Sequence, residues 1–372
     1  MADPTTSPPL TRTSVQAAHA IVKPYIHLTP ILTSTTLNTI ASTPQTPESL
    51  VGTPYEDQTP ARPTFNLFFK CENLQKIGAF KARGAFHAIS RLAPKERAKG
   101  VITHSSGNHA QATALAARTF GIPAHIVMPS ISTASKVAST RSLGAQVYFS
   151  GSTAPERLEA LSAVQAANPG AVTVPPYDHP DIILGQGTVV LEFEDQVQGQ
   201  LDGKGGLDAV IAPLGGGGLL AGIATAMQGT GVRVFGAEPA YQGGNDGQRG
   251  LAAGKRVEEV STLTIADGLR TPVGLLNWTV ISDVEKVRGV FSVSEEQIKA
   301  ALRLVLERMK VVIEPSAAVP LAVVLFDEEF RRLVEREAGE GGWNVGVVFS
   351  GGNTTVEAIG KLFAEEGEKA TA

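Results

Sequence analysis

The sequence contains almost no cysteine and no long apolar run, and each absence excludes a class of protein. Cys71 is the single cysteine among 372 residues, which excludes an intramolecular disulfide and a cysteine-bound metal cluster. A reducing compartment, the cytoplasm, is therefore expected. No stretch approaches the roughly 18 to 20 consecutive apolar residues of a membrane-spanning helix. Residues 1–15 also lack the apolar segment of a secretory signal, so no membrane partner is expected.

Charge of either sign is also scarce. Charged residues make up 18% of the chain, the formal net charge is −4, and lysine and arginine form no dense cluster. We therefore expect no nucleic-acid partner. The chain is 42% hydrophobic and long enough to bury a substantial core, and its length indicates about two domains. Residues 43–63 hold five prolines among polar residues, which predicts a surface loop insertion.

The remaining chain alternates between two patterns. Short apolar runs predict strands, and longer segments with apolar residues at helical spacing predict the helices between them. The clearest predicted strands cover 66–70, 100–103, 124–128, 146–149, 171–174, 208–214, 232–237 and 345–349. Strands that alternate with helices are typical of an α/β protein with parallel sheets covered by helices on both faces.

Lys81 is the first candidate catalytic residue. It lies between Phe80 and Ala82, and Gly78 and Gly84 flank it at a short distance. A lysine among small and aromatic residues is open to partial desolvation, which lowers its pKa and allows it to form a Schiff base. The alternative is an ordinary solvated lysine on the first turn of a helix.

Four consecutive glycines, Gly215 to Gly218, separate a predicted strand from a predicted helix. Backbone amides there can approach an anion closely, and the helix N-terminus adds a favourable dipole, so a phosphate is the expected ligand. Gly216, Gly218 and Ala221 also match the dinucleotide pattern G-x-G-x-x-A, with Glu238 about 20 residues further on. A nicotinamide-dependent oxidoreductase is therefore an alternative, and a plain tight turn is another.

Other candidate residues also follow predicted strands, where open parallel sheets bind ligands. The segment HSSGNH, His104 to His109, offers groups that can hold a carboxylate, although a helix cap needs the same residue types. Ser350 begins SGGN after the last strand, which by itself is a plain turn. Glu314 precedes a proline and is either a carboxylate at a helix N-terminus or a site residue.

Seven segments taken together resemble the fold type II pyridoxal phosphate enzymes, specifically the serine/threonine dehydratase and serine racemase family. The likeness runs from about Ser14 to Lys361, apart from the 43–63 insertion. The segments are KCENLQKIGAFKARGA, THSSGNHAQA, GQGT, APLGGGGLLAG, TIADGL, ERMKVVIEPSAA and SGGN. The resemblance implies two open, mainly parallel twisted sheets flanked by helices, pyridoxal 5′-phosphate as cofactor, and a homodimer.

The resemblance implies that Lys81 carries the cofactor as a Schiff base and later removes the substrate α-proton. Phe80 and Asn108 would flank the cofactor ring, and Ser350 would meet its pyridine nitrogen. The implied cofactor-binding residues are Phe80, Lys81, Asn108, Gly215, Gly216, Gly217, Gly218, Leu219, Glu314 and Ser350. The implied substrate-binding residues are Ser105, Ser106, Asn108, His109 and Asp267.

The resemblance supports two reactions. Ser106 matches the second acid/base of serine racemases, whereas the residues 176–178, Pro-Tyr-Asp, are similar to a substrate-side loop of the dehydratases. We expect α,β-elimination from a small hydroxy amino acid, L-serine, L-threonine or 3-hydroxyaspartate, which gives a 2-oxo acid and ammonia. The alternative is a serine racemase that converts L-serine to D-serine with elimination as a side activity.

The resemblance also implies a divalent cation, Mg²⁺ or else Mn²⁺ or Ca²⁺, bound by Glu238, the Gly244 carbonyl and Asp246. Carboxylate oxygens suit such a cation, although solvated acids are the alternative. The loop between the two acids is two residues longer than in the family, which places the assignment of Asp246 and Gly244 in question.

The resemblance further implies two domains. A large cofactor-binding domain would consist of residues 1–99 and 179–372, and a small mobile domain of residues 100–178 would close over the site. Because the chain ends soon after SGGN, we expect no regulatory domain and no allosteric control by an end-product amino acid.

Overall fold

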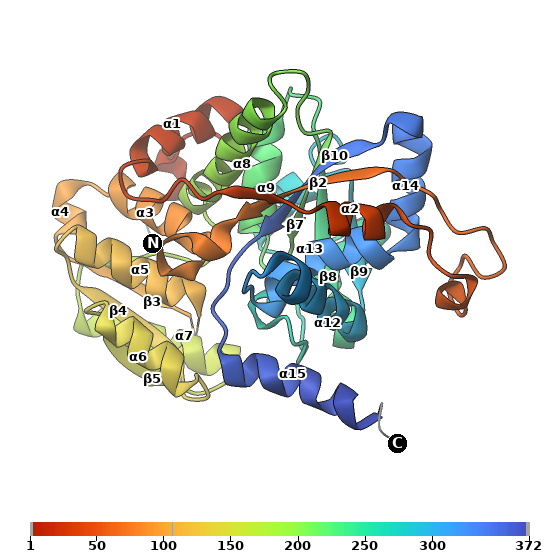
Figure 1. The fold of residues 1–372 in the computed structure, drawn as a ribbon. Helices are drawn as coiled ribbons and strands as arrows, with labels where there is room; N and C mark the ends of the chain where they lie inside the picture. The colour runs from red at the N-terminus through yellow and green to blue at the C-terminus, as the bar shows by residue number, and fades with distance from the viewer. Residues whose placement is uncertain (1–2, 106, 370–372) are drawn as a thin grey trace.

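The computed structural model describes residues 3–105 and 107–369. Figure 1 shows two groups of strands, each with its own covering helices. A six-stranded sheet has the order β1-β2-β10-β7-β8-β9, and a four-stranded sheet has the order β5-β4-β3-β6. Neighbouring strands are parallel except β1 and β2, which are antiparallel. The predicted α/β class with two mainly parallel sheets is confirmed.

The six-stranded sheet has both faces buried. Its strands are β1 (Ile31–Thr33), β2 (Phe65–Cys71), β7 (Ala209–Pro213), β8 (Arg233–Pro239), β9 (Gly289–Val293) and β10 (Trp343–Phe349). Successive side chains of a strand point to opposite faces, so Leu67 and Phe69 of β2 join one apolar cluster while Phe68 joins another. Burial on both faces explains why the sequence of this sheet reads as continuous apolar runs.

Two sets of helices cover this sheet. One face packs against α2 (Thr35–Ser42), α12 (Glu295–Leu304), α13 (Pro315–Phe326) and α14 (Glu328–Ala338). The other face packs against α1 (Arg12–Val22), α8 (Pro180–Gln200), α9 (Gly218–Met227) and α11 (Leu275–Ile281).

The four-stranded sheet is built from the middle of the chain. Its strands are β3 (Val101–His104), β4 (Ala124–Pro129), β5 (Gln146–Ser150) and β6 (Val172–Thr173). Its helices are α3 (Lys81–Arg91), α5 (Asn108–Thr119), α6 (Ala134–Ser142) and α7 (Ala154–Ala167), with α4 (Pro94–Arg97) between α3 and β3. Because α3 packs against both α5 and α8, it lies at the junction of the two sheets (Figure 1).

The remaining elements are short or lie at the edges. They are α10 (Asp246–Ala253), α15 (Val356–Lys369), the π-helix η7 (Val305–Met309) and the 3-10 turns η1 (Pro4–Thr6), η2 (Pro47–Leu50), η3 (Glu72–Leu74), η4 (Lys76–Gly78), η5 (Tyr241–Gly243), η6 (Asp267–Leu269) and η8 (Gly339–Gly341). No helix in the described part of the chain is both long and apolar enough to cross a membrane.

The 43–63 segment, predicted as a surface insertion, is anchored at both ends on α14. Glu328 accepts hydrogen bonds from the Gln45 side chain at 3.0 Å and from the Ala61 amide at 2.8 Å. Arg332 donates to the Thr59 carbonyl at 2.6 Å, and its guanidinium lies 4.8 Å from the centre of the Tyr55 ring. The segment therefore has defined contacts even though most of its residues are exposed.

Candidate active site

Lys81 is the first residue of α3, and its amine is turned into the protein. The Nζ atom donates a hydrogen bond of 2.7 Å to the carbonyl of Pro176, on the loop between β6 and α8, and lies 5.1 Å from the centre of the Phe80 ring. Burial lowers the pKa of Lys81 to about 8, while the carboxylate of Glu314 opposes this shift. The amine therefore loses its proton more readily than an ordinary lysine, and its uncharged form is the nucleophile.

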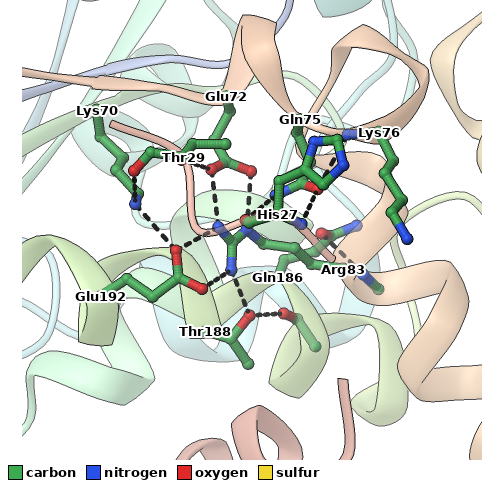
Figure 2. Close-up of polar contacts among 12 residues, drawn as sticks. His27, Thr29, Lys70, Glu72, Gln75, Lys76, Arg83, Gln186, Thr188 and Glu192 are labelled. Carbon is green, nitrogen blue, oxygen red and sulfur yellow. Dashed lines mark hydrogen bonds and ion pairs between the residues drawn. The ribbon is translucent and has the colours of Figure 1, made fainter. Parts of the chain in front are cut away.

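The turn between β2 and α3 delivers Lys81 to this position. The Gln75 side chain accepts hydrogen bonds from the amides of His27 and Lys76 at 2.8 and 2.9 Å, and donates one of 2.8 Å to the His27 carbonyl (Figure 2). Gly78 has a positive φ of 69°, and a Cβ there would lie 2.8 Å from the Asn353 side-chain oxygen. Glycine is therefore required at this point of the turn.

Phe80 connects this turn to the end of β10. Its backbone amide donates a hydrogen bond of 3.0 Å to the carbonyl of Ser350. Ser350 directly follows β10 and is buried. The carboxyl end of β10 and the start of α3 are therefore fixed to each other.

A buried carboxyl group, that of Glu314, lies next to two side-chain amides. Asn108, the first residue of α5, donates to it at 2.9 Å, and the Asn353 backbone amide donates at 3.1 Å. Asn353 also donates from its side chain to the Asn108 side-chain oxygen at 2.7 Å. Burial, together with the charge of Asp267, raises the pKa of Glu314 to about 7. The structure thus joins residues from three predicted segments in one polar cluster.

The glycine loop between β7 and α9 is closely surrounded. Gly217 has φ 95°, and a Cβ on Gly216 would lie 2.4 Å from the ring of Tyr177. Gly218 begins α9, and Leu219 follows it in the buried first turn. The first N–H groups of a helix have no acceptor within the helix, so this loop can hold an anion such as a phosphate. Tyr177 follows the carbonyl that binds Lys81, which places the loop and the lysine close together.

The segment HSSGNH lies between β3 and α5. The Ser105 amide donates to the Val127 carbonyl at 3.0 Å, and the Ser105 hydroxyl accepts from the Gly107 amide at 3.3 Å. His109 is buried, with Nε2 3.1 Å from the Val174 carbonyl and Nδ1 without a partner among the described residues. Burial lowers the pKa of His109 to about 3, so the ring is neutral at physiological pH. Ser106 lies outside the described residues.

Asp267 in η6 pairs with a residue that the sequence did not single out. Its carboxylate lies 2.7 Å from the amine of Lys136 on α6. The pair connects a helix of the four-stranded sheet to a turn beside Glu314. Nothing in the sequence around Lys136 predicts this contact, because the two residues are 131 positions apart.

Glu238 and Asp246 lie near the glycine loop, because Asp246 binds the Val273 amide and the next residue, Gly274, donates to the Gly216 carbonyl. Both oxygens of Glu238 accept backbone amides at the start of α10, from Gly247 at 2.8 Å and from Gln248 at 2.9 Å. One oxygen of Asp246 accepts the Val273 amide at 2.9 Å, and the other is buried with no partner in the described part of the chain. Burial raises the pKa of Asp246 to about 6 and that of Glu238 well above its usual value.

Glu238 and Asp246 could bind a cation, but two carboxylates do not supply enough ligands for a metal site. The described residues contain no group of three or more His, Cys, Asp or Glu side chains that could hold a metal ion. A cation would therefore need a backbone oxygen as well. The loop between the two acids contains Gly244 and two residues with positive φ, Gln242 at 49° and Gly243 at 75°.

Replacing Glu314 with Gln should change how stability depends on pH. Because the folded-state pKa of about 7 lies above the ordinary value of 4.5, the carboxyl group stabilises the fold at low pH and loses this contribution as pH rises from 4.5 to 7. The free energy of unfolding of wild type, relative to Glu314→Gln, should fall by up to about 3 kcal/mol between pH 5 and pH 8. Urea denaturation of the cofactor-free proteins measures this, with the exposed Glu340→Gln as background. An unchanged difference would contradict the assignment.

The chain resembles known proteins over nearly its whole length. Residues 49–351 match the family described as "Pyridoxal-phosphate dependent enzyme". A serine racemase of Arabidopsis thaliana is 40% identical over 94% of this chain and 95% of its own length. An L-threo-3-hydroxyaspartate ammonia-lyase of Saccharomyces cerevisiae is 39% identical over 92% of this chain and 93% of its own length.

Solved structures give the same result. The structure of maize serine racemase matches with a TM-score of 0.81 and 36% identity, covering 97% of this chain and 99% of that one. The nicotinamide alternative receives no support from these comparisons. The chain therefore belongs to the pyridoxal-phosphate dependent enzyme family.

Proposed function

We propose that this enzyme deaminates a small hydroxy amino acid, L-serine, L-threonine or L-threo-3-hydroxyaspartate, to a 2-oxo acid and ammonia. The observation that carries the proposal is the amine of Lys81, which has a lowered pKa and lies beside both the glycine loop and the Glu314 cluster. The similarity to the yeast ammonia-lyase supports this reaction. Family membership supports pyridoxal phosphate as the cofactor.

The residues around Lys81 fit this cofactor. The amides of Gly215 to Leu219 would hold the phosphate group, and a side chain on Gly216 would collide with Tyr177 and close the loop. Asn108 and Ser350 would contact the ring and Lys81 its aldehyde carbon. When bound, pyridoxal phosphate supplies an electron sink for the carbanion at the substrate α-carbon.

The chain's own groups would then bind the substrate and move protons. Ser105, Asn108 and the backbone amide of His109 would hold the substrate carboxylate at the start of α5, where the helix dipole favours an anion. The Lys81 amine, with its pKa of about 8, would take the α-proton, since a base near neutral pKa works best at physiological pH. The residues Asp267 and Lys136 would border the substrate site.

We further propose that residues 100–178 form a small domain that moves against the large domain, residues 1–99 and 179–372. Closure would exclude water from the carbanion. Two contacts support a defined closed position. Lys136 pairs with Asp267, and the Asp178 carboxylate accepts the Leu276 amide at 2.9 Å. A homodimer in the cytoplasm is proposed from the resemblance and from the single cysteine.

Replacing Lys81 with Ala tests the proposed function. The purified variant should lose visible absorbance, because no Schiff base forms, and release of 2-oxo acid should fall by about 10²-fold or more without the base. Absorbance spectra and a 2-oxo acid assay with L-serine, L-threonine and L-threo-3-hydroxyaspartate measure both. Lys76→Ala, a lysine on the preceding turn, is the control and should keep both properties. Unchanged absorbance in Lys81→Ala would refute the role of this lysine.

A second candidate function is serine racemisation. The similarity to serine racemases favours it, and Ser106 matches the residue expected to protonate the second face. Ser106→Ala should abolish D-serine formation from L-serine while sparing release of 2-oxo acid. Chiral chromatography and the 2-oxo acid assay on one sample measure both products. Equal loss of the two activities would argue against a two-base mechanism.

We propose a divalent cation, Mg²⁺, Mn²⁺ or Ca²⁺, at Glu238, the Gly244 carbonyl and Asp246. The unpartnered, buried oxygen of Asp246 beside a second carboxylate supports this site. Its role would be structural, because the two acids bind backbone amides at the start of α10 and just before α11.

Addition of Mg²⁺ should stabilise the wild-type protein and not Asp246→Asn. At 100 times the dissociation constant the gain is about 2.7 kcal/mol, which thermal unfolding with and without MgCl₂ detects. NaCl at matched ionic strength controls for screening. Equal stabilisation of the variant would place the cation elsewhere.

A further inference from the structure

A network of buried charged side chains joins the first turn of α3 to β2, η3 and α8. The network consists of Lys70 from β2, Glu72 from η3, Arg83 from α3 and Glu192 from α8. Figure 2 shows the two carboxylates beside the Arg83 guanidinium, with Lys70 reaching Glu192. The exposed fractions of the four residues, in chain order, are 0%, 0%, 0% and 5%. Two cations and two carboxylates are thus enclosed with balanced charge.

Arg83 binds both carboxylates with two hydrogen bonds each. Its Nε and Nη2 atoms donate to Glu72 at 2.7 and 2.8 Å, and its Nη1 and Nη2 atoms donate to Glu192 at 2.9 and 2.7 Å. Lys70 binds the second carboxylate from another side at 2.9 Å and the Thr29 carbonyl at 2.8 Å. Such paired contacts fix direction as well as distance.

Stability alone does not account for this arrangement. Well-packed apolar residues of similar volume are often as stabilising as a buried ion network, because desolvation offsets most of the attraction between the charges. The network's contribution is to fix the position of one helix relative to another. It joins α3 to α8, and α8 begins at Pro180, four residues after the Pro176 carbonyl that binds the Lys81 amine.

The first turn of α3 lacks the usual means of fixing a helix N-terminus. Phe80 at the N-cap position forms no side-chain hydrogen bond to the helix, and the first turn contains no acidic residue. Its first residue is Lys81, a cation at the end of the helix where the dipole disfavours positive charge. Contacts from other segments hold this turn instead. The Phe80 amide binds the Ser350 carbonyl at 3.0 Å, and the Gly84 amide binds the Gln186 side chain of α8 at 3.1 Å. The Arg83 network adds the ionic contacts.

We infer that Arg83 is a positioning residue that, through Glu72 and Glu192, keeps the first turn of α3 and the Lys81 amine fixed against Pro176. The inference rests on the role proposed for Lys81. Weakening the contacts of Arg83 with Glu72 and Glu192 would let water reach the Lys81 amine. Its pKa would then rise toward the ordinary value of 10.5. The other titratable groups that act on this amine are Glu314, before α13, and His109 on α5.

The test is Glu192→Gln, with Glu194→Gln as the matched control. Glu194 lies two residues further along α8 and pairs with Arg12 on α1 at 2.6 Å, away from α3. Trace acetylation of the cofactor-free proteins across pH, with mass spectrometry of the peptide that contains Lys81, gives the pKa of this amine. We expect a rise of at least one pH unit in Glu192→Gln and none in Glu194→Gln.

The direction of the shift separates positioning from simple electrostatics. Removing a nearby negative charge would lower the pKa of the amine, whereas loss of burial raises it. A fall or no change in Glu192→Gln would therefore overturn the inference. Because labelling needs no cofactor and no turnover, this outcome is distinct from failure of the proposed reaction.

A charge-balanced double variant guards against misfolding. Lys70→Met with Glu192→Gln removes one charge of each sign, so the Arg83–Glu72 pair stays neutral while the ionic contacts to Glu192 of α8 are lost. The hydrogen bonds from Arg83 to Thr188 and from the Gly84 amide to Gln186 remain. This variant should show the same rise in the pKa of Lys81. An unshifted pKa in a folded double variant, as judged by circular dichroism, would also overturn the inference.

Discussion

The structure depends on keeping one lysine amine buried and within hydrogen-bond distance of a carbonyl on another loop. Lys81 reaches Pro176 at 2.7 Å, and burial lowers its pKa to about 8. Burying a cation without a paired anion costs free energy. The segments around Lys81 must therefore be held rigidly enough to keep the amine in place.

Three features impose this rigidity. The turn after β2 is fixed by Gln75 and by close contact between Gly78 and Asn353. The Arg83 network joins α3 to α8. The loop at Tyr177 packs against Gly216, which brings the glycine loop to the same place. The two sheets contribute to one site because these contacts converge where α3 lies between them.

Much of the fold and of the site followed from the sequence, because strand ends and glycine turns are local features. The parallel strands and the residues around Lys81 and Gly216 are of this kind. Contacts between distant segments were not predictable. The antiparallel strand β1 has only three residues and follows a proline, which is too short for an alternating pattern to identify it. The Lys136–Asp267 pair and the anchoring of the 43–63 insertion on Glu328 leave no local pattern.

The most direct measurement is to reduce the purified protein with borohydride and map the modified peptide by mass spectrometry. Borohydride reduces a Schiff base to a stable amine. The peptide that contains the cofactor-bearing lysine therefore retains the added mass of the reduced cofactor. We expect a phosphopyridoxyl group on Lys81 and on no other lysine. A modified lysine elsewhere, or a protein that binds the cofactor without any covalent bond to Lys81, would contradict it.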